Sequence, residues 1–96
     1  MNIIISEKTK DYLKKKNINC LTLNMVITAS GDFNGCAIPQ VIYEEPKDAN
    51  GYHHALVDNI NVFIHKSAIE DDMKLEFVLR KFLLHKYVDV EGIKIL

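Results

Sequence analysis

The strongest constraint on the fold is a pair of segments in which apolar side chains occupy every second position. One segment runs from Leu21 to Ile27 and the other from Ile60 to Ile64. A period of two residues is typical of strands that bury one face, since successive side chains point to opposite sides of a sheet. The 96 residues are enough for one domain with a single core. We therefore expect half-buried strands packed around one small core.

One segment carries a helical signature instead. Ser6 is a favourable N-cap, and Glu7 suits the positive end of a helix dipole. The lysines at positions 14–16 suit the negative end, and Asn17 is a suitable stop. The sequence therefore predicts a helix from Glu7 to about Lys16 that ends in solvated lysines.

Turn-forming residues divide the rest of the chain into short strands. Asn59 predicts the turn of a hairpin, Gly92 predicts a bend near the end, and the turn-rich stretch 29–35 predicts a loop. The expected strands lie at 3–5 (an edge strand), 38–44, 52–58, 60–65 and 88–95. With one helix among six or seven short strands, the expected class is α+β.

Residues 66–85 fit two patterns. Leu75, Phe77 and Leu79 alternate as in a strand, whereas Leu75, Val78, Leu79, Phe82 and Leu83 have the spacing of a helical stripe. Patterning alone slightly favours a helix here.

The charge balance excludes several function classes as first choices. Twelve Lys and Arg against thirteen Asp and Glu give a net charge of −1, which argues against a nucleic-acid binder and against a polybasic membrane surface. No apolar run approaches the roughly 18–20 residues that span a bilayer, and no signal-peptide pattern begins the sequence. Two cysteines are too few for a disulfide scaffold. We expect a cytoplasmic protein with reduced thiols.

The main candidate for chemistry is Cys36, which follows a stretch bracketed by Gly31 and Gly35. Glycines let backbone N–H groups turn toward a thiolate or an anion. This binding loop would make Cys36 a metal ligand or a reactive thiol. The alternative is a small buried residue that closes a turn, which is a common role of free cysteine.

Other residues favour structural roles. We interpret Cys20 as a residue with a plain structural role. His53 and His54 cannot chelate one ion together because strand neighbours point to opposite faces. His65 and His85 each lie near an expected strand end. The acidic triplet 70–72 lacks the spacing of a calcium loop and is interpreted as a solvated turn. The sequence contains no G-x-S-x-G, H-E-x-x-H or P-loop motif that would indicate an enzyme.

The order of these segments resembles the HesB/IscA-like family, the A-type carriers of iron–sulfur cluster assembly. The lead Ile3-Ile4-Ile5-Ser6 before the helix, the Gly31…Gly35-Cys36-Ala37 stretch, and the segment from Val57 to Ser67 match that family's pattern in order and spacing. The chain is also similar to a small HesB-like subgroup with an adjacent Cys/selenocysteine pair in this loop. The resemblance implies one HesB-like domain over 1–96, with mixed β-sheets in a sandwich and an N-terminal helix. It also implies an extended segment at 74–84.

Two departures from the family's cysteine pattern weaken what the resemblance implies about function. No cysteine follows Cys36, so the family's C-terminal Cys-x-Cys is missing, and Asn34-Gly35 stand where the subgroup has a paired thiol or selenol. The resemblance then implies a degenerate homodimeric carrier that binds iron or an iron–sulfur cluster weakly through Cys36 and meets iron–sulfur assembly partners, without nucleic acid or membrane. A single-thiol redox protein and an interaction domain that kept only the fold remain alternatives.

Overall fold

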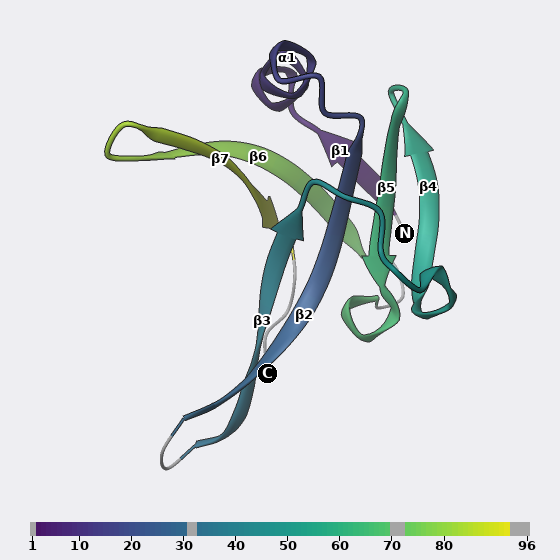
Figure 1. Cartoon of the computed structure of the whole chain (residues 1–96), viewed down its shortest axis with the longest axis vertical. Coiled ribbons are helices and arrows are strands. Elements are labelled where there is room, and N and C mark those ends of the chain that lie inside the picture. Colours follow the sequence, from purple (N-terminus) through teal and green to yellow (C-terminus); the bar gives the residue numbers. More distant parts are fainter. Residues whose placement is uncertain (1, 31–32, 70–72, 93–96) are drawn as a thin grey trace.

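The computed structural model describes residues 2–30, 33–69 and 73–92, and these residues form one helix, two short 3₁₀ turns and seven strands in two sheets (Figure 1). The helix is α1 (Glu7–Lys15). The strands are β1 (Asn2–Ile5), β2 (Cys20–Ser30), β3 (Phe33–Ile42), β4 (Tyr52–Val57), β5 (Ile60–His65), β6 (Lys74–Phe82) and β7 (His85–Glu91). The 3₁₀ turns are Ala49–Gly51 and Lys66–Ala68. The expected α+β class is confirmed.

The smaller sheet has the order β1-β6-β7. β1 runs parallel to β6, with Ile5 opposite Phe77, and β6 and β7 form an antiparallel hairpin. The expected edge strand at 3–5 is therefore confirmed as β1. The far end of the β6–β7 hairpin projects away from the rest of the chain (Figure 1).

The larger sheet has the order β3-β2-β5-β4. β2 pairs with β5 only from Cys20 to Leu23, where the two strands are parallel. From Asn24 onward β2 pairs with β3 alone, so these two strands continue as a two-stranded arm (Figure 1). β3 is an outer strand, a position that suits Pro39 because proline has no backbone N–H to donate.

One hydrophobic core lies between the two sheets and α1. The predicted inward faces supply most of it, and the fully buried members include Leu13 of the helix. The core residues are Ile5, Leu13, Leu21, Leu23, Ile60, Val62, Ile64, Ala68, Met73, Leu75, Phe77, Val88 and Val90. The half-buried strands expected from the period of two are thus confirmed.

Hydrogen bonds at the start of α1 tie the helix to β6. The Ser6 hydroxyl accepts from the Thr9 N–H at 3.3 Å, which confirms the predicted N-cap. The Thr9 hydroxyl donates to the Phe77 carbonyl at 3.1 Å, so the Ser6 hydroxyl must donate to Thr9 Oγ1 at 2.6 Å. The Ser6 N–H also donates to the Phe77 carbonyl at 3.1 Å.

The helix stop and the hairpin turn also match their predictions. Asn17 has φ 56°, and the Ile18 N–H donates to the Leu13 carbonyl, so the helix ends in a Schellman motif. Asp58 and Asn59 have φ 50° and 66°, the positive values that a two-residue type I′ turn requires.

Residues 74–82 form strand β6, which corrects the helix favoured by patterning and confirms the extended segment implied by the resemblance. Leu75 and Phe77 are fully buried, whereas Phe82 and Leu83 of the helical stripe are 67% and 76% exposed. Pairing with both β1 and β7 outweighs the local helical pattern, because the core accepts only the alternating set.

The loop expected at 29–35 is also corrected. β2 continues to Ser30 and β3 begins at Phe33, well before the predicted start at position 38. β7 ends at Glu91, and Gly92 follows with φ 98°, where a Cβ would lie 2.0 Å from the Lys74 carbonyl oxygen. The acidic triplet 70–72 and the tail 93–96 lie outside the described residues.

We predict that Thr9→Val lowers the free energy of unfolding by about 1–3 kcal/mol, because it leaves the buried Phe77 carbonyl with one donor fewer and removes the acceptor of the Ser6 hydroxyl. Urea unfolding followed by circular dichroism measures this change. The exposed Asp11→Asn on the same helix is the control and should shift stability by less than about 0.5 kcal/mol. Equal stabilities of Thr9→Val and wild type would contradict the role of this hydrogen bond.

Candidate functional site

The structure places Cys36 on strand β3 rather than in a loop. Its backbone is opposite Thr28 of β2, on the projecting arm of the larger sheet. Gly35 precedes it on the same strand, while Gly31 lies outside the described residues. The predicted binding loop is therefore the end of a two-stranded ribbon, and Cys36 lies beyond the part of β2 that pairs with β5.

Cys20, the other thiol, lies at the opposite end of β2. It is 6% exposed, and burial raises the pKa of its thiol above the ordinary 9.0. Cys20 and Thr28 are separated along one strand by about 26 Å at roughly 3.3 Å per residue. Cys20 and Cys36 of one chain therefore cannot bind the same metal ion, and Cys20 has the structural environment that the sequence indicated.

The histidines of β4 and β5 have local structural partners. His54 stacks on Phe63 with ring centroids 4.5 Å apart, and its Nε2 lies 2.9 Å from Asn61 Oδ1. The Nδ1 atom of His65 lies 2.6 Å from Ser67 Oγ. His53 and His54 are neighbours on β4, so their side chains lie on opposite faces of the strand, as expected from strand geometry.

The sheet register separates these histidines from Cys36. His65 follows the short β2–β5 pairing that ends at Leu23, whereas Cys36 is opposite Thr28. His85 begins β7 at the end of the other hairpin. Among the side chains that the structure describes, which do not include those of residues 27–37, no group of three or more His, Cys, Asp or Glu is arranged to hold a metal ion.

A second feature was missed from the sequence. The end of the β6–β7 hairpin exposes Phe82, Leu83 and Leu84, and a groove of about 410 Å³ separates the hairpin from α1. Lysines from both elements line this groove. The sequence signal for this feature is the run Lys81-Phe82-Leu83-Leu84-His85-Lys86, an apolar triplet between basic residues. The net charge of −1 gave no indication of it, because net charge sums over the whole chain.

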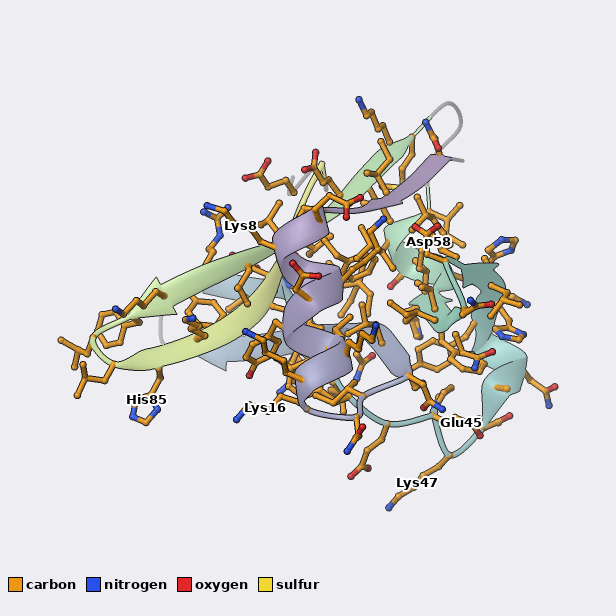
Figure 2. All side chains as sticks on the ribbon, turned by 90° about the horizontal axis from the view of Figure 1, so that it is seen from above. Lys8, Lys16, Glu45, Lys47, Asp58 and His85 are labelled. Carbon is orange, nitrogen blue, oxygen red and sulfur yellow. The ribbon has the colours of Figure 1, made fainter. Side chains whose placement is uncertain are left out.

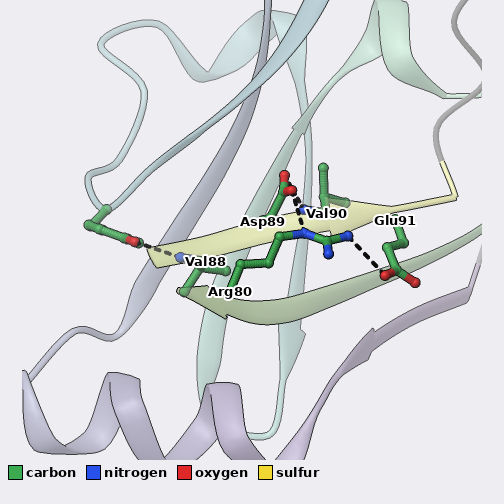
Figure 3. Close-up of polar contacts among 6 residues, drawn as sticks. Arg80, Val88, Asp89, Val90 and Glu91 are labelled. Atoms are coloured by element: carbon green, nitrogen blue, oxygen red, sulfur yellow. Dashed lines mark hydrogen bonds and ion pairs between the residues drawn. The ribbon is translucent and has the colours of Figure 1, made fainter. Parts of the chain in front are cut away.

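On the same hairpin, Arg80 of β6 joins two carboxylates of β7 (Figure 3). Its Nε donates to Asp89 at 2.7 Å and its Nη2 to Glu91 at 3.0 Å. These contacts, with the Asp89 hydrogen bond foremost, raise the pKa of the guanidinium above its ordinary value. Beside them, the Val88 N–H donates to the Tyr43 hydroxyl at 3.1 Å, which links β7 to the larger sheet.

The two-sheet fold with one N-terminal helix is shared with a solved structure from Escherichia coli. The structure of SufA, described as involved in biosynthesis of iron–sulfur clusters, matches with a TM-score of 0.58 at 9% identity. The match covers 95% of this chain and 80% of that one. At this identity the likeness establishes the fold, and it confirms the HesB-like architecture expected from the sequence.

Family membership follows from the sequence of the same region. Residues 1–93 match the model of the CC/Se motif containing family, and the chain belongs to that family. This confirms the similarity to the Cys/selenocysteine subgroup. No curated protein matches the chain.

The helical part of the described structure has no membrane-spanning candidate. α1 is nine residues long and is therefore too short to cross a bilayer.

We predict that Cys20 reacts slowly in the folded protein. In a Cys36→Ala variant, which leaves Cys20 as the sole thiol, iodoacetamide at pH 8 should modify the native protein at least tenfold more slowly than the protein in urea, because burial limits access and disfavours the thiolate. Mass spectrometry of timed samples measures both rates. Equal rates would show that Cys20 is open to solvent.

The same burial predicts a pH dependence of stability. Below about pH 9 the thiol keeps its proton in both states and contributes no slope. Above that value the unfolded chain loses the proton and the native chain retains it, so the free energy of unfolding falls as pH rises. Urea unfolding between pH 8 and 10 should show this fall in the wild type and a smaller one in Cys20→Ala. Identical slopes would contradict a raised pKa in the native state.

Proposed function

We propose that this protein is a single-cysteine, HesB-like iron-binding protein of the cytoplasm. Two copies meet along the β2–β3 arm, and the Cys36 thiolates of both copies bind iron or a small iron–sulfur cluster. The cluster is cargo that passes between assembly partners. The observation that carries the proposal is the place of Cys36 on a projecting two-stranded arm, in a member of the CC/Se motif family with the fold of SufA.

The open edges of the arm support pairing between copies. β2 has a partner on both sides only as far as Leu23, and β3 is an outer strand along its whole length. Unpaired strand edges present N–H and C=O groups that a second chain can satisfy. Ile38 on this edge is 47% exposed, which adds an apolar contact to such a pairing.

The number and placement of the thiols explain why a second copy is needed to bind a cluster. An iron–sulfur cluster is usually held by four thiolates. In one chain, Cys20 begins β2, whereas Cys36 lies on β3 opposite Thr28, far along β2 from Cys20. A pair of chains supplies two Cys36 thiolates. The remaining positions would be open to small thiols or partner ligands, so binding should be weak and the cargo transferable.

The test is anaerobic reconstitution with ferrous iron and sulfide. The wild type should develop thiolate-to-iron absorption and should sediment at twice its mass of 11.0 kDa. Cys36→Ser should lose at least nine tenths of the bound iron, because a serine hydroxyl is a poor ligand for this metal.

Cys20→Ala is the matched control, because it removes the other thiol and should keep the wild-type spectrum. Circular dichroism of each variant separates loss of a ligand from loss of folding. Equal iron content in wild type and Cys36→Ser, with both folded, would overturn the proposal.

A further inference from the structure

The end of the β6–β7 hairpin exposes three consecutive large apolar side chains. Phe82, Leu83 and Leu84 are 67%, 76% and 90% exposed. The hairpin is anchored below this point, where the Tyr12 hydroxyl donates to the Lys86 carbonyl at 3.2 Å. Beyond that anchor it projects from the body of the protein (Figure 1). We call Phe82, Leu83 and Leu84 the apolar tip.

Four lysines, which we call the lysine belt, lie on the hairpin next to the apolar tip and in the groove between the hairpin and α1. Lys81 and Lys86 are opposite each other in the β6–β7 register. Lys8 and Lys15 of α1 line the same groove of about 410 Å³, in which Asp11 is the single acidic side chain. Within the described part of the chain, none of these four lysines lies within 4.0 Å of a carboxylate.

Among the described acidic side chains, Asp11 shares the groove with the lysines, and two others are paired with an arginine. Asp89 and Glu91 are both held by Arg80 (Figure 3). In Figure 2 the β6–β7 hairpin extends to one side of α1 with His85 near its end, while Glu45 and Asp58 lie on the other side. The net charge of −1 is therefore unevenly distributed, and the hairpin end is positive.

We propose that the β6–β7 hairpin docks this protein on an anionic bilayer surface. The apolar tip enters the boundary between headgroups and acyl chains, and the lysine belt contacts lipid phosphates. This proposal concerns a different face from the Cys36 arm and does not depend on iron binding.

The spacing along the hairpin fits the depth profile of a bilayer interface. Lys81 lies two residues before Leu83, which is about 7 Å at roughly 3.3 Å per residue. Interfacial elements bury their apolar face by about 5–10 Å, with cations at the level of the headgroups. The apolar tip and the lysine belt therefore match both layers at once.

The shape of the tip favours a bilayer over a protein partner. A projecting tip needs a complementary pocket in a protein, whereas lipid chains rearrange around it. A second copy is also disfavoured, because three side chains expose far less than the roughly 800 Å² that each partner buries in a stable dimer. Lysine side chains suit a lipid surface further, since their stems remain in apolar contact while the ammonium groups reach the phosphates.

The test uses tryptophan as a reporter, because the natural chain contains none. Leu84→Trp places the indole on the apolar tip. Leu56→Trp is the matched control, as Leu56 lies on β4 and is 66% exposed. Emission spectra are recorded with vesicles of phosphatidylcholine alone and of phosphatidylcholine with phosphatidylglycerol.

We expect the emission of Leu84→Trp to shift to the blue with the anionic vesicles only, and that of Leu56→Trp to stay unchanged. The chain without a tryptophan reporter should co-sediment with the anionic vesicles. The double variants Lys81→Gln/Lys86→Gln and Leu83→Ser/Leu84→Ser should co-sediment at least tenfold less, and circular dichroism checks that each variant is folded. Raising the salt concentration should release the protein, because the phosphate contacts are screened.

Three results would overturn the proposal. The first is the same emission of Leu84→Trp with and without anionic vesicles. The second is a blue shift that depends on protein concentration in the absence of lipid, which would assign the apolar tip to a second copy. The third is a blue shift of Leu84→Trp with an acidic protein from a membrane-free extract and no shift with vesicles. That result would assign the apolar tip to a protein partner.

Discussion

The burial of one face of each sheet against the other is the interaction on which the rest of the structure depends. Leu23 and Ile64 of the larger sheet and Leu75 and Phe77 of the smaller sheet are all fully buried. Each contributes roughly 1.5–3 kcal/mol when removed from water. Both parallel pairings, β1 with β6 and β2 with β5, join segments far apart in the sequence. Only a shared core offsets the entropy of closing such long loops.

Two strand pairs extend beyond this small core. The β2–β3 arm continues beyond the last pairing with β5, and the β6–β7 hairpin continues beyond its contact with α1 at Tyr12. On the hairpin extension, the side chains of Phe82, Leu83 and Leu84 lie outside the core and are exposed. Cys36 lies on one extension and the apolar tip on the other. The fold thus separates a rigid centre from two projecting ends.

Local signals in the sequence were sufficient for the elements that local chemistry controls. The Ser6 cap, the Asn17 stop and the turn at Asn59 each depend on a few neighbouring residues, and all were predicted. Residues 74–82 could not be assigned from their own pattern, because their strand form depends on pairing with β1 and β7. Cys36 remains a predicted thiol site, and the sequence did not indicate its place on a strand, because that depends on how far β2 and β3 stay paired.

The net charge of −1 does not describe any single surface of this protein. It sums over the whole chain, whereas a surface interacts through its local field, which decays within about 8–10 Å at physiological salt. Arg80 pairs with Asp89 and Glu91, so within the described residues the four lysines of the groove face Asp11 as its one acidic lining residue. The two projecting ends also point in different directions (Figure 1). Pairing of two copies through the β2–β3 arms would therefore leave both apolar tips accessible, and a dimer would present two anionic-lipid contacts where a monomer presents one. Two linked contacts bind a surface more tightly than either alone, so metal-dependent dimerisation and membrane docking would strengthen each other without sharing a residue.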